Sequence, residues 1–175
     1  MTDTGRLPRF LVVGLGSPDR GDDAVGPVVA RTVAALAVPG LRVVEREDPT
    51  SLIDLWDGGD GSVELTVVID AVRSDQPAGS LVVLETGCHA APLTNDAWAR
   101  TGRGGTHAFG LAESVELARA LRRLPERVVL VGIGAAAFAH GAPLSEPVAA
   151  AVGPAVDAVS VLLAPTGEVG ADVPG

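Results

Sequence analysis

The chain has 175 residues, the length of one domain with a sizeable core, and 47% of them are hydrophobic, which excludes a disordered chain. Its formal net charge of -9 argues against a nucleic-acid partner, because phosphate contacts need a basic face. Small molecules, metal ions and proteins remain as partners.

The single cysteine and the N-terminal residues narrow the class of protein further. Cys88 is the only cysteine, so an intrachain disulfide and a cluster of thiolate ligands are both excluded, and an incidental thiol is favoured over a nucleophile. Residues 1–10 lack the apolar core of a secretory signal, and no apolar run reaches the roughly 18–20 residues that span a bilayer. We expect a cytoplasmic protein without membrane insertion.

Five apolar runs predict strands, at residues 9–14, 41–46, 65–70, 80–85 and 127–134. Helical spacing predicts four helices. The first begins near Asp22 or Asp23, and the other three cover 50–57, about 108–123, and 145–163 with Ser145 as N-cap. In the first helix, an Asp is expected to be the N-cap.

The connections between the runs predict the fold class. Residues 65–70 are apolar on both faces, as in a parallel sheet. The link 71–79 is too short for a parallel crossover, so the strand at 80–85 is expected to be antiparallel. The prediction is an α/β three-layer sandwich, with a five-stranded, mostly parallel sheet and helices on both faces. One domain is expected over 1–175, with its core at about 9–163 and a loose tail from Pro165.

The loop GLGSPDRGDDAVG, at 14–26, follows the first strand. Gly14 and Gly16 fit a dinucleotide-binding fingerprint, but Asp19 stands at its third glycine position. Asp22 and Asp23 would repel a phosphate at the helix N-terminus by roughly 1–4 kcal/mol for each close pair. One carboxylate suffices to cap a helix. The second favours a cation in the cleft above the sheet.

The candidate ligands for this cation come from three loops. Asp23 follows the first strand and Asp70 ends the third, so both lie at the carboxyl edge of the sheet, although Asp70 also suits a turn cap. The long polar link 86–106 can cross back to this edge and is followed by His107, whereas His89 and His140 suit surface loops. Two carboxylates and one imidazole suit a borderline divalent metal.

Taken together, the motifs resemble a known family. They are GLGSPDRGDDAVGPVVA (14–30), VVIDAV (67–72), THAFGLAESVELA (106–118), VLVGIG (129–134) and PLSEPVAAAV (143–152). In this order, from residue 10 to about 163, they resemble the hydrogenase maturation proteases, the endopeptidases that trim the C-terminus of nickel-iron hydrogenase large subunits.

The resemblance implies a ligand set. The metal ligands of the family fall on Asp23, Asp70 and His107, which would also carry the metal-mediated catalysis. The metal would be nickel carried by the substrate, with zinc or cadmium able to replace it in crystals. A lesser role as general base stays open for Asp22, for which helix capping is the favoured interpretation.

The resemblance also implies the substrate-binding loop and the partner. Gly14, Gly16 and Ser17 would bind substrate, and Ser17 stands where the family usually has Asn. The partner would be a nickel-iron hydrogenase large-subunit precursor, cut after nickel insertion with the metal as recognition signal. Hydrolysis would be of metallo or metal-dependent aspartic type.

Two other functions stay open from the sequence. One is a nucleotide- or S-adenosylmethionine-binding module that uses GLG and an acid at the end of the second strand, Glu45 or Glu47. The other is a non-catalytic hydrogenase assembly factor that keeps the fold and contacts the hydrogenase without cutting it.

Overall fold

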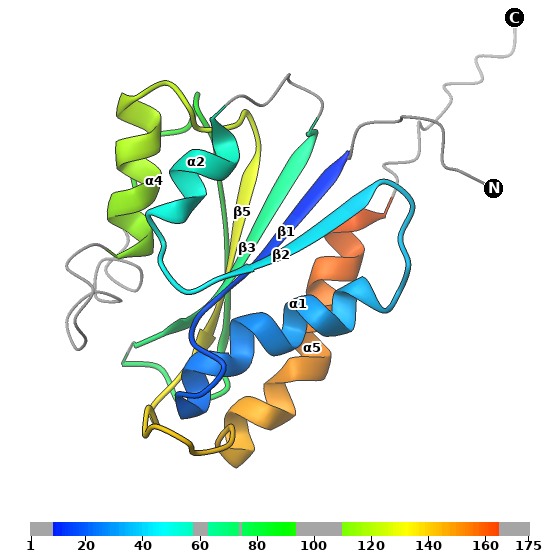
Figure 1. The fold of residues 1–175 in the computed structure, drawn as a ribbon, viewed down its shortest axis with the longest axis vertical. Helices are drawn as coiled ribbons and strands as arrows, with labels where there is room; N and C mark the ends of the chain where they lie inside the picture. Colours follow the sequence, from blue (N-terminus) through cyan, green and yellow to red (C-terminus); the bar gives the residue numbers. More distant parts are fainter. Residues whose placement is uncertain (1–8, 58–62, 74, 94–109, 165–175) are drawn as a thin grey trace, which may run out of the picture.

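A single mixed sheet organises the chain (Figure 1). The computed structural model describes residues 9–57, 63–73, 75–93 and 110–164. The strands are β1 (Phe10–Leu15), β2 (Leu41–Arg46), β3 (Leu65–Val72), β4 (Leu81–Thr86) and β5 (Val128–Gly134). They lie in the order β2-β1-β3-β5-β4, and only β4 is antiparallel to its neighbour. This confirms the predicted fold class, including the antiparallel strand inferred from link length.

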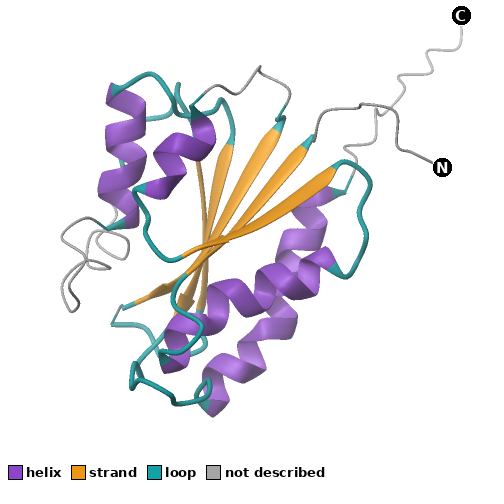
Figure 2. Ribbon diagram, viewed as in Figure 1, coloured by secondary structure: helices purple, strands orange, loops and turns teal. Residues whose placement is uncertain are grey.

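Helices cover both faces of the sheet, as Figure 2 shows. They are η1 (Gly21–Ala24, a 3-10 helix), α1 (Val25–Ala34), α2 (Ser51–Trp56), α4 (Leu111–Ala120) and α5 (Glu146–Leu163). Helices α1 and α5 pack together over one face, and α2 and α4 pack over the other. Val, Leu, Ile and Ala fill most of both cores, which matches the scarcity of aromatic residues.

Strand β3 lies in the middle of the sheet, between β1 and β5, and all eight of its residues are buried. It is longer than predicted, because Ala71 and Val72 continue the pairing with Ile133 and Gly134 of β5. Asp70 is therefore not the last residue of the strand. It lies inside the hydrogen-bonded ladder, opposite Gly132, so the pleat of the strand fixes the face of the sheet to which its side chain belongs.

The start of the first helix differs from the prediction. Asp22 and Asp23 lie in η1, the residue before α1 is Ala24, and neither η1 nor α1 has a side-chain cap. Both carboxylates are engaged elsewhere: Asp22 binds the chain between β5 and α5, and Asp23 binds the amide of Ser17. The expected Asp N-cap is therefore wrong. Ser145 does precede α5 as predicted, but it too makes no capping hydrogen bond.

Helix α5 corrects the expectation about apolar runs. Its 18 residues have a mean hydropathy of 1.5, so that by length and composition alone it could cross a membrane. One face of α5 packs in the core against α1 and the sheet, through Val148, Ala151, Ala155, Val156, Val159 and Leu163. These residues make up the buried third of the helix.

The first turn of α1 lies unusually close to the ends of β1 and β3. A Cβ added at Gly26 would overlap the carbonyl oxygen of Leu15 and lie 2.6 Å from that of Ile69. Gly14, on β1, faces this turn, and its added Cβ would lie 2.6 Å from the carbonyl oxygen of Gly26. The backbones of helix and strands therefore pack against each other without an intervening side chain.

We predict that Gly26→Ala lowers the free energy of unfolding by at least ~2 kcal/mol, because the added methyl group forces α1 away from two strands. Urea unfolding followed by circular dichroism would measure this. Gly153→Ala is the control, since its Cβ would meet no atom within 4 Å, and it should change the free energy by about 1 kcal/mol or less. Equal effects of the two substitutions would contradict the close contact.

Candidate functional site

The candidate site lies where the order of the strands reverses. From β1 the chain passes through α1 to β2 on one side, and from β2 it passes through α2 to β3 on the other side of β1. Gly14 pairs with Ile69 across β1 and β3, so their carboxyl ends lie side by side. Open α/β sheets bind ligands in the crevice at such a switch point.

The loop after β1 presents Asp23 at this edge. Gly16 has φ of 127°, a conformation that suits glycine, and its added Cβ would overlap the carbonyl oxygen of Asp23. The amide of Ser17 donates a hydrogen bond of 2.8 Å to Oδ2 of Asp23. The loop thus folds back on the carboxylate and fixes its position. Oδ1 of Asp23 has no hydrogen bond within the described ranges.

Asp70 is the second carboxylate of the site and is only 8% exposed. Burial, and then the nearby charge of Asp23, raise the pKa of Asp70 to about 8, against a smaller opposing effect of the Ala71 amide. Among the described residues, no cation pairs with Asp23 or Asp70. Two neighbouring carboxylates, one of them buried, leave a site that a cation would stabilise.

Asp22 has a different surrounding from its neighbour Asp23. It is completely buried, and its carboxylate accepts four hydrogen bonds of 2.7–3.1 Å, from the amides of Ala136, Ala137 and Ser145 and from the Ser145 hydroxyl. Burial opposes its ionisation, but these bonds outweigh burial and lower the pKa of Asp22. Asp22 therefore connects η1 to the chain between β5 and α5, and its oxygens are engaged in that connection.

A cation–π pair at the same edge was missed by the sequence analysis. The guanidinium carbon of Arg73, the residue after β3, lies 4.0 Å from the ring centroid of Phe138, in the connection from β5 to α5. Arg73 follows Asp70 by three residues and is exposed. The two residues are 65 positions apart in the chain, so only the tertiary fold reveals the pair.

The histidines and the cysteine fall into two groups. His107 lies outside the described residues. His140 is exposed in the connection after β5, at the carboxyl edge. His89 and Cys88 follow β4 and so lie at the opposite edge, because β4 is antiparallel to β5. The structure brings Asp23 and Asp70 together, and Cys88 and His89 are not near them.

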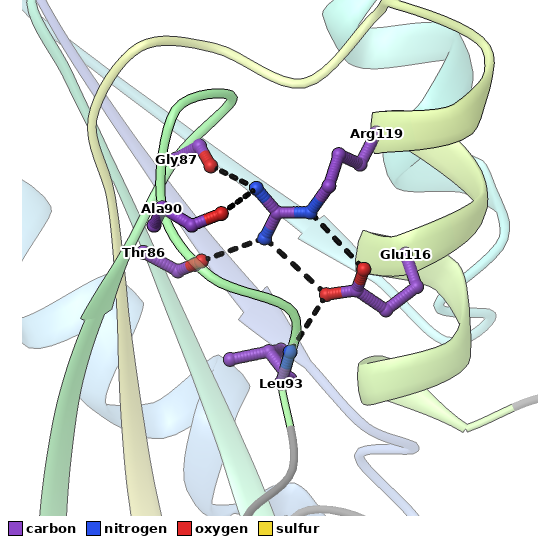
Figure 3. A network of polar contacts seen from close by, with 6 residues as sticks. All are labelled: Thr86, Gly87, Ala90, Leu93, Glu116 and Arg119. Atoms are coloured by element: carbon purple, nitrogen blue, oxygen red, sulfur yellow. Dashed lines mark hydrogen bonds and ion pairs between the residues drawn. The ribbon is translucent and has the colours of Figure 1, made fainter.

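A polar network on α4 holds the chain before the segment that contains His107 (Figure 3). Arg119 donates hydrogen bonds to the carbonyl oxygens of Gly87 and Ala90 and to the Thr86 hydroxyl, and Glu116 accepts one of 3.0 Å from the Leu93 amide. Arg119 and Glu116 are also paired at 3.0 Å.

The residues described on either side of 94–109 lie at different heights along α4. Leu93 is held partway along α4, whereas Gly110 immediately precedes its first turn. Because α4 leads into the amino end of β5, its own N-terminus points toward the carboxyl edge (Figure 1). Gly110 therefore lies toward the edge of the sheet at which Asp23 and Asp70 lie.

Two of the three predicted metal ligands lie in the described part of the chain. Asp23 and Asp70 would supply carboxylate oxygens, and the predicted third ligand, His107, would supply an imidazole nitrogen. Within the described ranges alone, no group of three His, Cys, Asp or Glu side chains is placed to hold a metal. Two carboxylates and a neutral imidazole suit a divalent metal, which can bind Asp70 only after the carboxyl group loses its proton.

We predict that Asp70→Asn stabilises the protein increasingly as pH rises from 5 to 8. In this window the native Asp70 keeps a proton that the unfolded chain has lost, so unfolding becomes easier with pH at a limit of about 1.4 kcal/mol per unit. The asparagine cannot ionise and escapes this loss. Urea unfolding of both proteins should show a difference that grows by about 2–4 kcal/mol across the window. A constant difference would contradict the raised pKa.

We predict that the stability contributed by Asp22 depends on pH in the opposite sense to that of Asp70. Asp22→Ala removes a buried acceptor of four hydrogen bonds and should lower the free energy of unfolding by about 3 kcal/mol at pH 7. Because the pKa of Asp22 is lowered in the native state, its contribution is present above the unfolded pKa and disappears as pH falls through the folded value. Asp19→Ala, at an exposed position of the same loop, is the control and should have little effect.

Comparisons with known proteins identify the family of the chain. The sequence model of the family described as hydrogenase maturation protease matches residues 50–161, a range that includes Asp70 and His107 but not Asp23. A search of curated proteins found no match.

Solved structures of maturation proteases share the fold. The chain is 27% identical to the [NiFe] hydrogenase maturation protease HybD of Thermococcus kodakarensis, with a TM-score of 0.64 over 89% of this chain and 99% of that one. It is also 27% identical to hydrogenase 2 maturation peptidase of a Thaumarchaeota archaeon, with a TM-score of 0.61 over 89% and 98%. The HybD endopeptidase of E. coli, at 18% identity, shares the fold with a TM-score of 0.66 over 89% and 91%. The family match and the shared fold confirm the resemblance seen in the motifs: the chain belongs to the hydrogenase maturation protease family.

Proposed function

We propose that the chain is the endopeptidase that removes the C-terminal extension of a nickel-iron hydrogenase large-subunit precursor after nickel insertion. Membership of the family supports the reaction class and the kind of partner. The observation that carries the site is the pair Asp23 and Asp70, two adjacent carboxylates without a cation within the described ranges, at the strand-order switch point. The reaction would take place in the cytoplasm, before the hydrogenase is complete.

The electrostatics of the pair suggest how nickel acts as the recognition signal. Asp23 and Asp70, with His107 as third ligand, would contact the nickel that the precursor carries. A precursor without nickel would bring no cation to the site, and Asp70 would remain protonated at neutral pH because its pKa is raised. A nickel-loaded precursor would displace this proton and join both carboxylates. The charge of the inserted metal would thus separate loaded from unloaded precursors.

The same residues would serve hydrolysis. A divalent metal next to the scissile bond can polarise its carbonyl group or lower the pKa of a water molecule. Asp22 is a poor general base, because its oxygens are engaged in four hydrogen bonds with the connection between β5 and α5. A metal-mediated mechanism that uses Asp23, Asp70 and His107 therefore fits the chain better than one that uses Asp22.

The loop 14–17 would have a narrower role in substrate binding than its motif suggests. Gly14 and Gly16 allow close contacts with Gly26 and Asp23, which is a packing role. Ser17 is partly exposed, and its amide orients Asp23. Of the three predicted substrate-binding residues, Ser17 is the one whose side chain is free to contact the precursor.

We predict that the full chain shortens a nickel-loaded large-subunit precursor and leaves the nickel-free precursor intact. Intact-mass spectrometry of the precursor would detect the released C-terminal peptide. Asp23→Asn, Asp70→Asn and His107→Ala should each reduce the cleavage rate at least ~100-fold, since each removes one ligand of the recognised metal. Asp19→Asn is the matched control and should cleave at the unmutated rate.

Other outcomes would point to other functions. Binding of a matched precursor without any cleavage would favour the non-catalytic assembly factor. Cleavage that survives all three ligand substitutions would mean that the site lies elsewhere. Cleavage of nickel-free precursor at the same rate would contradict metal recognition while leaving the protease function in place.

A further inference from the structure

Arg73 is an exposed residue at the carboxyl edge of the sheet, directly after β3 and three residues after Asp70. Its guanidinium carbon lies 4.0 Å from the ring centroid of Phe138, well inside the roughly 6 Å of a cation–π contact. An exposed arginine ordinarily loses rotamer freedom when it binds a partner. Stacking on a ring restricts this freedom in advance, so Arg73 is prepared for a contact.

The segment that carries Phe138 is fixed next to the candidate site. The Ala135 amide donates a hydrogen bond of 2.9 Å to the Val72 carbonyl oxygen, at the end of β3. Two further amides of this connection donate to the Asp22 carboxylate. The Phe138 ring is partly buried and packs against the core beneath α1 and α5. The ring is therefore a firm support for the guanidinium.

The charge of Arg73 is not compensated within the described part of the chain. Its guanidinium makes no ion pair and no side-chain hydrogen bond there, and neither Asp23 nor Asp70 pairs with it. The exposed acids of the neighbouring segments do not pair with it either; they are Asp19, Asp75 and Glu146. The N–H donors of Arg73 therefore remain available to a substrate.

The other described arginines differ from Arg73 in one of two respects. Some are paired with an acid; they are Arg9, Arg31, Arg119, Arg123 and Arg127. The rest are unpaired but do not lie over an aromatic ring; they are Arg20, Arg42, Arg46 and Arg122. Among the described arginines, only Arg73 is both supported by a ring and without an acid.

The position of Arg73 sets its reach from the metal. At about 3.3 Å per residue, it lies about 10 Å beyond Asp70 along the direction of β3. An extended peptide covers this distance with about three residues. A precursor whose metal is bound by Asp23 and Asp70 can therefore place a nearby part of its C-terminal extension against Arg73. The planar guanidinium suits a carboxylate, with which it forms charge-assisted hydrogen bonds.

We propose that Arg73 binds a carboxylate of the precursor's C-terminal extension, and that Phe138 is the positioning residue that holds Arg73 for this contact. The carboxylate belongs to an acidic side chain or to the chain terminus of the extension. The inference rests on the proposed function, because it concerns the same substrate. Arg73 binds no metal and takes no part in hydrolysis, so the contact acts on substrate binding.

Cleavage kinetics of the nickel-loaded precursor separate binding from chemistry. Arg73→Ala should raise KM about 10-fold and leave kcat within about twofold. Arg73→Lys should recover only part of this loss, because an ammonium group lacks the planar fork. Arg42→Ala, at an exposed arginine of β2 without an ion pair in the described ranges, is the matched control and should change neither constant.

Phe138→Leu tests the positioning role. It keeps an apolar side chain against the core but removes the ring under the guanidinium. It should raise KM about threefold, with kcat unchanged, at a temperature at which circular dichroism shows the variant to be folded. In the double variant with Arg73→Ala, Phe138→Leu should have no further effect on KM.

Two altered precursors identify the carboxylate. One carries amides in place of the acidic side chains of the extension, and the other carries an amidated C-terminus. The precursor that lacks the bound carboxylate should show a raised KM with the unmutated protein and no further rise with Arg73→Ala. If only the amidated terminus has this effect, the carboxylate is the terminal one.

The proposal is overturned if Arg73→Ala leaves KM unchanged, if it lowers kcat alone, or if its full effect persists on both altered precursors. These results leave the peptidase function in place. An unmutated protein that does not cleave the loaded precursor would overturn the proposed function, and this contact with it.

Discussion

The candidate site depends on the direct contact between the first turn of α1 and the carboxyl ends of β1 and β3. Gly14 and Gly26 make this contact possible, since a side chain at either position would separate helix and strands. The contact places η1, and with it Asp23, directly above the strand that carries Asp70. A shift of α1 by one methyl group would move one carboxylate relative to the other. Packing of backbone on backbone thus fixes the geometry of a charged pair.

Asp22 and Asp23 are adjacent in sequence but have opposite roles because of where their oxygens point. Asp22 is buried and saturated with four hydrogen bonds, and the Asp22 amide donates to the Ala137 carbonyl at 2.7 Å. Together with the bond of 2.7 Å from the Gly141 amide to the Asp19 carbonyl, this joins the loop after β1 to the connection after β5. Asp23 keeps an oxygen without a hydrogen bond within the described ranges. One acid holds the two loops together, and the other lies beside Asp70 at the carboxyl edge of the sheet.

The parts of this arrangement that depend on local pattern could be predicted from the sequence, and those that depend on tertiary contacts could not. Apolar runs located all five strands, and the short link 71–79 revealed that β4 is antiparallel. The pairing of Asp23 with Asp70 followed from the rule that parallel strands end at one edge. The Asp N-cap was wrong because a distant loop binds Asp22, and the end of β3 was misplaced because pairing with β5 extends it. The contact of Arg73 with Phe138 has no local signal in the sequence at all.

The proposed function gives a reason for the unfavourable burial of Asp70 beside Asp23. Burial of Asp70 beside Asp23 disfavours its ionised form, and the folded chain tolerates this because two apolar cores surround the sheet. A hydrogenase precursor that brings nickel would let Asp70 ionise by joining both carboxylates to one cation, whereas a precursor without nickel would leave Asp70 protonated. The free energy by which loaded and unloaded precursors are distinguished would then come from the attraction of the metal to Asp23 and Asp70, which outweighs the cost of removing the proton from Asp70. A site in which both carboxylates were already neutralised by arginine or lysine would lose this discrimination, so the absence of a cation beside Asp23 and Asp70 within the described ranges is what the proposed selectivity requires.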